Sequence, residues 1–244
     1  MPSSTSDQRV LIPQHIEPLL RHIGRLADQM HMPAYAVGGC VRDWLLGLED
    51  AQDLDVTVEG NGIDLARAVG QGLSAPVTVH QQFGTATIAM RGTCRRRLDI
   101  ATCRRETYAR PAAYPRVEPG TLSDDLFRRD FTINAMAVVL APARYGALVD
   151  PFHGARDLGM KRLRILHPRS FLDDPSRILR GIRFRHRFGL RWTPQTARTM
   201  REALASGVLS RLNAGRLQRE LDRMCDEPNP PACFQELAAL LQSV

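Results

Sequence analysis

Two aspartates spaced two residues apart, Asp53 and Asp55, stand at the start of a predicted strand at 53–58. Side chains two apart in a strand project from the same face, so both carboxylates reach the same space. Such a pair suits divalent cations, and two metal ions can stabilise the attacking and leaving oxygens of a phosphoryl displacement. The pair therefore predicts phosphate chemistry, with kinases and nucleases still open at this point.

A glycine pair, Gly38 and Gly39, separates a short apolar run at 35–37 from a helical pattern at 41–48. A helix that opens on a glycine turn offers free backbone N–H groups and the positive end of its dipole, which favour an anion. We interpret 34–60 as strand, turn, helix and strand. This stretch places an anion-binding turn next to the carboxylate pair.

Further polar residues follow in the next hundred positions. Asp99 lies in a predicted strand and points away from its apolar neighbours, where it either joins the carboxylate pair or faces solvent. The Arg-Arg-Asp cluster at 128–130 either grips a triphosphate and a ribose hydroxyl or forms surface ion pairs. Asn134 sits in an apolar run, so we expect it to be buried and hydrogen-bonded.

Three arginines, Arg177, Arg180 and Arg183, step around the side of a predicted helix at 176–189 that lies opposite its apolar residues. At 3.6 residues per turn, each arginine is offset from the previous one by about 60° around the helix axis. Like charges three apart repel, so the spacing favours an anionic or hydrogen-bond-accepting partner against them. A plain basic helix face is the alternative.

The charge of the chain agrees with a phosphate-bearing partner. Its 244 residues carry a formal net charge of +7, and Lys161 is the one lysine among 33 basic residues. Arginine makes bidentate phosphate contacts, so the excess predicts nucleic-acid or polyphosphate partners, unless it reflects genome composition and a solvated surface.

Cysteine spacing argues against a zinc-binding or disulfide-rich protein, and hydropathy argues against a secreted or membrane protein. The five cysteines form no C-x-x-C pair, so we expect neither a zinc site nor a disulfide framework. No signal-peptide core or membrane-spanning run is found. We therefore expect a cytoplasmic protein with no membrane partner.

The elements that must position these residues follow from periodicity. A disordered start covers residues 1 to about 10, a hairpin turn is expected at 91–93, and a long, lid-like loop at 104–125. A helix is predicted to start near Ser123 and to run through the apolar stretch to Leu140. Before that loop we predict helices at 13–30 and 63–73 and strands at 77–79, 85–90 and 97–101.

The predicted secondary structure changes in the last third of the chain, from mixed strands and helices to helices alone. A basic connector at 154–164 precedes a region that we predict to be helical only, from Ser170 onward. Its helices are expected at 176–189, 193–206, 213–225 and 232–241. The fold class is therefore α+β, a small mixed or antiparallel sheet with helices followed by an all-α region.

Taken in order, these motifs resemble one family. The resemblance rests on GGCVRD at 38–43 with Asp53-Leu54-Asp55, RRDFTINA at 128–135, DPSRILR at 174–180 running into Arg183-Phe184, and Arg216 with Glu220. The chain is similar to the class II tRNA nucleotidyltransferases and bacterial poly(A) polymerases, within the polymerase-beta-like nucleotidyltransferases. The likeness covers about 34–225.

The resemblance implies a role for each matching residue. Asp53 and Asp55 would bind two Mg²⁺ ions, and Asp99 would complete the catalytic carboxylates. The pair Asp174 and Arg177 would select the incoming base, since an acceptor beside a donor fits cytosine or adenine better than guanine or uracil. The nucleotide would be bound by Gly38, Gly39, Arg42, Arg129, Asp130, Asn134, Asp174, Arg177, Arg180 and Arg183.

The implied reaction is attack of an RNA 3′-hydroxyl on the α-phosphate of CTP or ATP, without a template. We expect addition of C, A or both to tRNA 3′ ends. A poly(A) polymerase and a non-catalytic RNA- or nucleotide-binding module are the alternatives.

The resemblance also predicts the division of the chain. We expect a catalytic head at 1–160 and a helical neck at 161–244, with the family's body and tail absent or truncated. A minimal enzyme, a fragment and a homo-oligomer that shares the RNA are all open interpretations.

Overall fold

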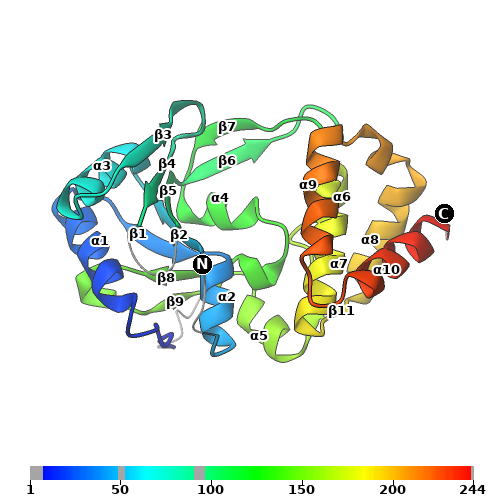
Figure 1. Ribbon diagram of the computed structural model, residues 1–244, viewed down its shortest axis with the longest axis horizontal. Coiled ribbons are helices and arrows are strands. Elements are labelled where there is room, and N and C mark those ends of the chain that lie inside the picture. The colour runs from blue at the N-terminus through cyan, green and yellow to red at the C-terminus, as the bar shows by residue number, and fades with distance from the viewer. Residues whose placement is uncertain (1–7, 49–52, 91–96, 243–244) are drawn as a thin grey trace. The chain divides into compact units, whose positions relative to one another are not determined.

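The computed structural model describes residues 8–48, 53–90 and 97–242 (Figure 1). Cys94, the turn expected at 91–93 and most of the disordered start lie outside the described residues. The chain divides into two compact units, each described here by itself. We call them the sheet unit, which contains the described residues up to Arg105 with Val117–Arg129 and Asn134–Ala155, and the helical unit, which contains Glu106–Arg116, Asp130–Ile133 and the residues from Arg156 on.

The sheet unit is built on one mixed sheet with the strand order β3-β4-β5-β2-β1-β8-β9. Neighbouring strands of this sheet are antiparallel except β2 and β5, which run parallel with Asp55 opposite Asp99. The strands are β1 (Ala34–Val37), β2 (Asp53–Val58), β3 (Val77–His80), β4 (Thr85–Ala89), β5 (Arg97–Thr102), β8 (Ala137–Val139) and β9 (Leu148–Val149). The α+β prediction is confirmed, as is each strand predicted before residue 104.

Amphipathic helices cover this sheet. α1 (Glu17–Gln29) and α3 (Gly62–Gly72) pack on each other and on the strands, with Leu20, Ile23 and Leu65 fully buried. α1 begins four residues later than predicted, after a turn at 14–16. The remaining helical elements of the unit are α2 (Gly39–Leu45), η1 (Gln81–Phe83), α4 (Leu122–Phe127) and η3 (Pro142–Arg144).

Two predictions between residues 104 and 140 are wrong. The helix expected to continue to Leu140 ends at Phe127, and the apolar run enters the sheet as β8 between β1 and β9. A short run that is buried on all sides has no period to distinguish helix from strand. The predicted loop at 104–125 holds two paired strands, β6 (Arg104–Thr107) and β7 (Arg116–Pro119), joined by the proline-bearing stretch.

The helical unit is centred on an aromatic cluster. Phe131 is fully buried, and its ring centre lies 6.4 Å from that of Phe171 and 6.1 Å from those of Phe184 and Trp192. Gly181 allows this packing, because a Cβ there would lie 2.2 Å from the indole ring.

The helices of this unit follow the predicted positions closely. They are α6 (Ser170–Asp173), α7 (Ser176–Phe188), α8 (Pro194–Ala205), η4 (Val208–Arg211), α9 (Ala214–Cys225) and α10 (Pro230–Gln242). α7 ends at Gly189, whose φ of +62° is the left-handed conformation that glycine adopts without strain. The prediction of helices only is wrong at β11 (Arg191–Trp192), which pairs in parallel with β10 (Arg162–Leu163).

The predicted connector at 154–164 also contains structure. It holds α5 (Gly154–Gly159) and the strand β10. η2 (Thr132–Asn134) follows the Arg-Arg-Asp cluster. No helix within the described ranges has the length and apolarity needed to cross a membrane.

Candidate active site

The glycine turn brings an arginine against the carboxylate strand. Gly38 has a φ of +80°, and a Cβ there would lie 2.5 Å from Nη1 of Arg129 and 3.8 Å from Oδ2 of Asp55. Only a residue without a side chain leaves room for that guanidinium. Gly39 then begins α2 directly after the turn. The turn, the arginine and the carboxylate therefore lie together.

Asp55 is the carboxylate that lies against the glycine turn. Burial raises its pKa, and the charges of Asp99 and Asp53 act in the same direction, while Arg129 opposes them. Crowded carboxylates of this kind are stabilised by a cation, and their oxygens are the donors that Mg²⁺ prefers. Asp53 and Asp55 thus fit a divalent metal by the chemistry of their donors.

Asp99 lies beside the carboxylate pair, and its catalytic role stays a prediction. It is opposite Asp55 in the sheet register, and its Oδ1 accepts from Thr87 Oγ1 at 2.6 Å and from Arg97 Nε at 2.9 Å. Across the residues that the structure describes, no three His, Cys, Asp or Glu side chains converge as a metal site. The register brings Asp99 beside the pair, whereas its hydrogen bonds direct it to Arg97.

Arg42 is buried and bound to groups of the protein. Its Nη1 donates to Oδ1 of Asn134 at 2.6 Å, and its Nε donates to Oδ1 of Asp43 at 2.9 Å. The prediction that Asn134 is buried and hydrogen-bonded is confirmed. These contacts fix α2 to the segment that enters β8.

Asp125 is a buried partner of the site arginine Arg129 that sequence reasoning missed. Its carboxylate is fully buried and accepts from Arg128 Nη2 at 2.7 Å and Arg129 Nη2 at 3.0 Å. Burial would raise its pKa, but Arg129 and Arg128 together bring the pKa below its usual value. An acid three and four residues ahead of two arginines on a helix was the available signal.

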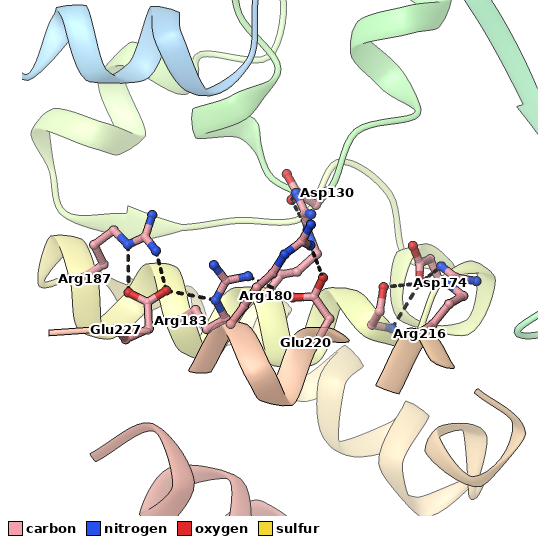
Figure 2. A network of polar contacts seen from close by, with 10 residues as sticks. Asp130, Asp174, Arg180, Arg183, Arg187, Arg216, Glu220 and Glu227 are labelled. Carbon is pink, nitrogen blue, oxygen red and sulfur yellow. Dashed lines mark hydrogen bonds and ion pairs between the residues drawn. The ribbon is translucent and has the colours of Figure 1, made fainter. Parts of the chain in front are cut away.

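In the helical unit, Asp130 pairs with Arg180. Oδ2 of Asp130 accepts from Arg180 Nε at 2.8 Å, and Oδ1 accepts from the backbone N–H of Phe131 at 2.7 Å (Figure 2). Asp130 raises the pKa of Arg180. The aspartate of the Arg-Arg-Asp cluster is therefore held by α7.

Asp174 lies between α6 and α7, where the chain is extended. Its Oδ1 accepts from the backbone N–H and hydroxyl of Ser176 and lies 2.6 Å from Nη2 of Arg216 (Figure 2). The neighbouring Arg177 is buried, and its Nη1 donates to Ser170 Oγ at 2.7 Å. The local chain therefore fixes both members of the predicted base-selecting pair.

Arg183 lies between two buried carboxylates. Its Nη1 donates to Glu220 and its Nε donates to Glu227, both at 2.9 Å (Figure 2). Arg187 donates to Glu227 as well, from Nε at 2.8 Å. The expectation that acceptors lie against the arginines of α7 is confirmed, and the acceptors include carboxylates of the chain itself. Glu227 was missed because no local pattern links it to α7.

The predicted site residues thus form two groups. The sheet unit holds the turn, the carboxylate pair and the polar residues near them, in Gly38, Gly39, Arg42, Asp53, Asp55, Asp99, Arg129 and Asn134. The helical unit holds the nucleotide-selecting candidates, in Asp130, Asp174, Arg177, Arg180 and Arg183. What either group contacts in a complex stays a prediction.

Comparison with known proteins agrees with this arrangement. Residues 34–164 match the poly A polymerase head domain family. The chain is 42% identical over 224 residues to the A-adding tRNA nucleotidyltransferase of Halalkalibacterium halodurans, covering 91% of this chain and 52% of that protein. It is 39% identical over 197 residues to the CC-adding tRNA nucleotidyltransferase of Deinococcus radiodurans, covering 80% and 50% respectively.

A solved structure shares the fold. The Thermotoga maritima CCA-adding enzyme complexed with tRNA superposes with a TM-score of 0.82 at 40% identity, covering 94% of this chain and 52% of that one. The chain spans about half of the length of these three proteins.

Proposed function

The chain belongs to the class II tRNA nucleotidyltransferase and poly(A) polymerase family, and on that premise we propose that it adds nucleotides to the 3′ end of tRNA without a template. The RNA 3′-hydroxyl would attack the α-phosphate of a nucleoside triphosphate and release pyrophosphate. Because tRNA and nucleotides are the substrates, the proposed place of reaction is the cytoplasm.

One observation carries the proposal. The guanidinium of Arg129 and Oδ2 of Asp55 both lie against the Gly38 turn. A turn that holds an arginine and a carboxylate side by side combines an anion site with a cation site. Transfer of a nucleotidyl group needs both, since charge develops on the phosphoryl oxygens and on the leaving pyrophosphate.

The residues of the sheet unit would divide this work. Asp53 and Asp55 would hold Mg²⁺, which when bound neutralises the triphosphate and activates the attacking hydroxyl. Arg129 and the N–H groups of the turn would orient the triphosphate. Arg42 would support the turn through Asn134, because its contact to that amide is already made.

The helical unit would supply the choice of base. Asp174 offers an acceptor and Arg177 a donor, a combination that pairs with the Watson–Crick edge of adenine or cytosine. We propose that these two side chains take the place of a template. Arg180 and Arg183 would keep the helix that carries Arg177 in position through Asp130, Glu220 and Glu227.

Within the family we propose A addition as the finer activity. The A-adding relative shares more of this chain, and at greater identity, than the CC-adding one. The substrate would then be a tRNA that already ends in CC, and ATP would be the nucleotide. Poly(A) synthesis is the alternative within the family.

The test is incorporation of each labelled nucleotide into tRNAs that end before the first C, after one C or after CC. We expect one AMP to enter the tRNA ending in CC. Asp53→Asn or Asp55→Asn should lower the rate by more than about 100-fold, because metal assistance is worth several kcal/mol. Asp64→Asn, an exposed carboxylate of the same unit, is the matched control.

The outcomes separate the alternatives. CMP incorporation would replace A addition with CC or CCA addition, and a long AMP tract would indicate a poly(A) polymerase. Full activity in the Asp55→Asn variant would overturn the metal assignment. Binding of nucleotide without any incorporation would point to a non-catalytic module.

A further inference from the structure

Tyr114 presents an exposed ring in the helical unit. It leaves 72% of its surface open to solvent, more than any other aromatic side chain in the described ranges. Its ring centre lies 5.9 Å from the guanidinium carbon of Arg216. An exposed aromatic ring beside an arginine is a common arrangement in proteins that stack nucleobases.

The backbone around Tyr114 is held in place. The N–H of Ala112 donates to the carbonyl of Leu172 at 2.9 Å, which ties this segment to α6 two residues before Asp174. Ala112 has a φ of +61°, and Ala113 N–H donates to Arg110 at 3.2 Å, so the segment turns tightly. The ring therefore stands on a fixed segment of chain.

Arg216 connects the ring to the base-selecting carboxylate. Its Nη2 lies 2.6 Å from Oδ1 of Asp174, and its side chain is only 18% exposed. In the described part of the chain, the hydrogen bonds and the ion pair of the Asp174 carboxylate all fall on Oδ1, including those from Ser176. The other oxygen, Oδ2, remains as an acceptor for a ligand.

Tyr108 of the same segment shows what a structural tyrosine looks like here. It is half-buried, its hydroxyl donates to Glu106 at 2.9 Å, and burial raises its pKa. Tyr114 has no such burial, although it costs more to expose a ring than a polar residue. The contrast leaves the face of the Tyr114 ring open for contact with a ligand.

We propose that Tyr114 is a stacking residue for a nucleobase whose edge is held by Asp174. This inference rests on the proposed function and deepens it. The ligand class is a planar base, supplied by the incoming nucleotide or by the 3′-terminal nucleotide of the RNA. Tyr114 supplies the flat face, and Arg216 orients both the ring and the carboxylate.

The test compares Tyr114→Ala, Tyr114→Phe and Tyr114→Trp in the full chain. Loss of a stacked base costs about 5- to 100-fold in affinity, so Ala should raise one KM by that factor. Phe should behave like the unchanged protein, and Trp should match or exceed it. A raised KM for ATP identifies the nucleotide as the source of the base, and a raised KM for tRNA identifies the RNA. Phe83→Ala, an exposed ring in the sheet unit, should change neither KM.

A binding measurement separates this inference from the proposed function. ATP or tRNA added to the Tyr114→Trp variant should quench its fluorescence, whether or not incorporation occurs, whereas inorganic triphosphate should not. The signal is taken relative to the unchanged protein, whose tryptophans are Trp44 and Trp192. Equal quenching by triphosphate, unchanged KM values in Tyr114→Ala, or a Phe variant as impaired as Ala would overturn the stacking role.

Discussion

Replacement of Glu227 by glutamine should destabilise the helical unit strongly. Its side chain is fully buried and accepts from Arg183 and from Arg187, whose side chains are 9% and 36% exposed. Removal of one member of a buried ion pair costs about 3–5 kcal/mol, because the remaining charge is left without compensation. Glutamine keeps the volume of the side chain but loses its charge.

The structure places the expected loss below the top of that range. Arg187 regains water through its exposed third, and Arg183 keeps Glu220 at 2.9 Å. We therefore expect a decrease of about 2–4 kcal/mol in the free energy of unfolding. With a urea dependence of about 2 kcal/mol per M, the midpoint should fall by about 1 to 2 M.

Tryptophan fluorescence during urea unfolding is the measurement. Trp192 belongs to the helical unit and Trp44 to the sheet unit, so a Trp44→Phe background reports the helical unit alone. The control is Arg223→Ala, whose side chain is 51% exposed where it meets Glu220 and should cost less than about 1 kcal/mol. A Glu227→Gln midpoint equal to that of the control would refute the reasoning.

Further predictions follow from local packing and from helix capping. Gly181→Ala should lower the free energy of unfolding by about 1–3 kcal/mol despite the better helix propensity of alanine, because its Cβ would overlap Trp192. Gly159→Ala, which has open space around it, should raise the free energy of unfolding by about 0.5–1 kcal/mol. Thermal unfolding measures both changes. Thr121→Ala should cost about 1 kcal/mol by removing the cap of α4. A hydrogen bond from the Thr121 backbone N–H lowers the pKa of Asp124 to about 2. The stabilisation from the Asp124 carboxylate should therefore be complete above its ordinary pKa of 3.8 and be lost as pH falls toward 2. If the stability cost of Asp124→Asn does not shrink over that range, the assignment is wrong.

The sequence predicts the elements whose pattern is local. Helices such as α1, α7 and α9 carry one apolar face, and the strands β2 and β5 alternate, so periodicity alone located them. β8 could not be placed in this way, because its residues are buried on both faces between β1 and β9. Its strand character comes from its neighbours in the sheet, and one of them, β1, lies far earlier in the chain at Ala34–Val37.

The residues of the candidate site also divide into those that local spacing predicts and those that depend on the folded structure. The carboxylate pair, the glycine turn and the need for acceptors against the arginines of α7 follow from local spacing, whereas the identity of those acceptors does not. The position of Asp99 beside Asp55 depends on the parallel register between β2 and β5, which the sequence pattern did not specify. The partners Asp125 and Glu227 required three-dimensional pairing, since a buried charge is neutralised by whichever element folds against it.

The division of the chain into units has a consequence for inheritance. The chain passes from one unit to the other after Arg105, Arg116, Arg129, Ile133 and Ala155. Phe131, at the centre of the aromatic cluster of the helical unit, is therefore encoded within the stretch that otherwise builds the sheet unit. A single genetic crossover near residue 155 would combine the helices of one parent with the residue at position 131 of the other. Chimaeras between relatives should therefore be more stable when the short segment around Phe131 comes from the same parent as the helices.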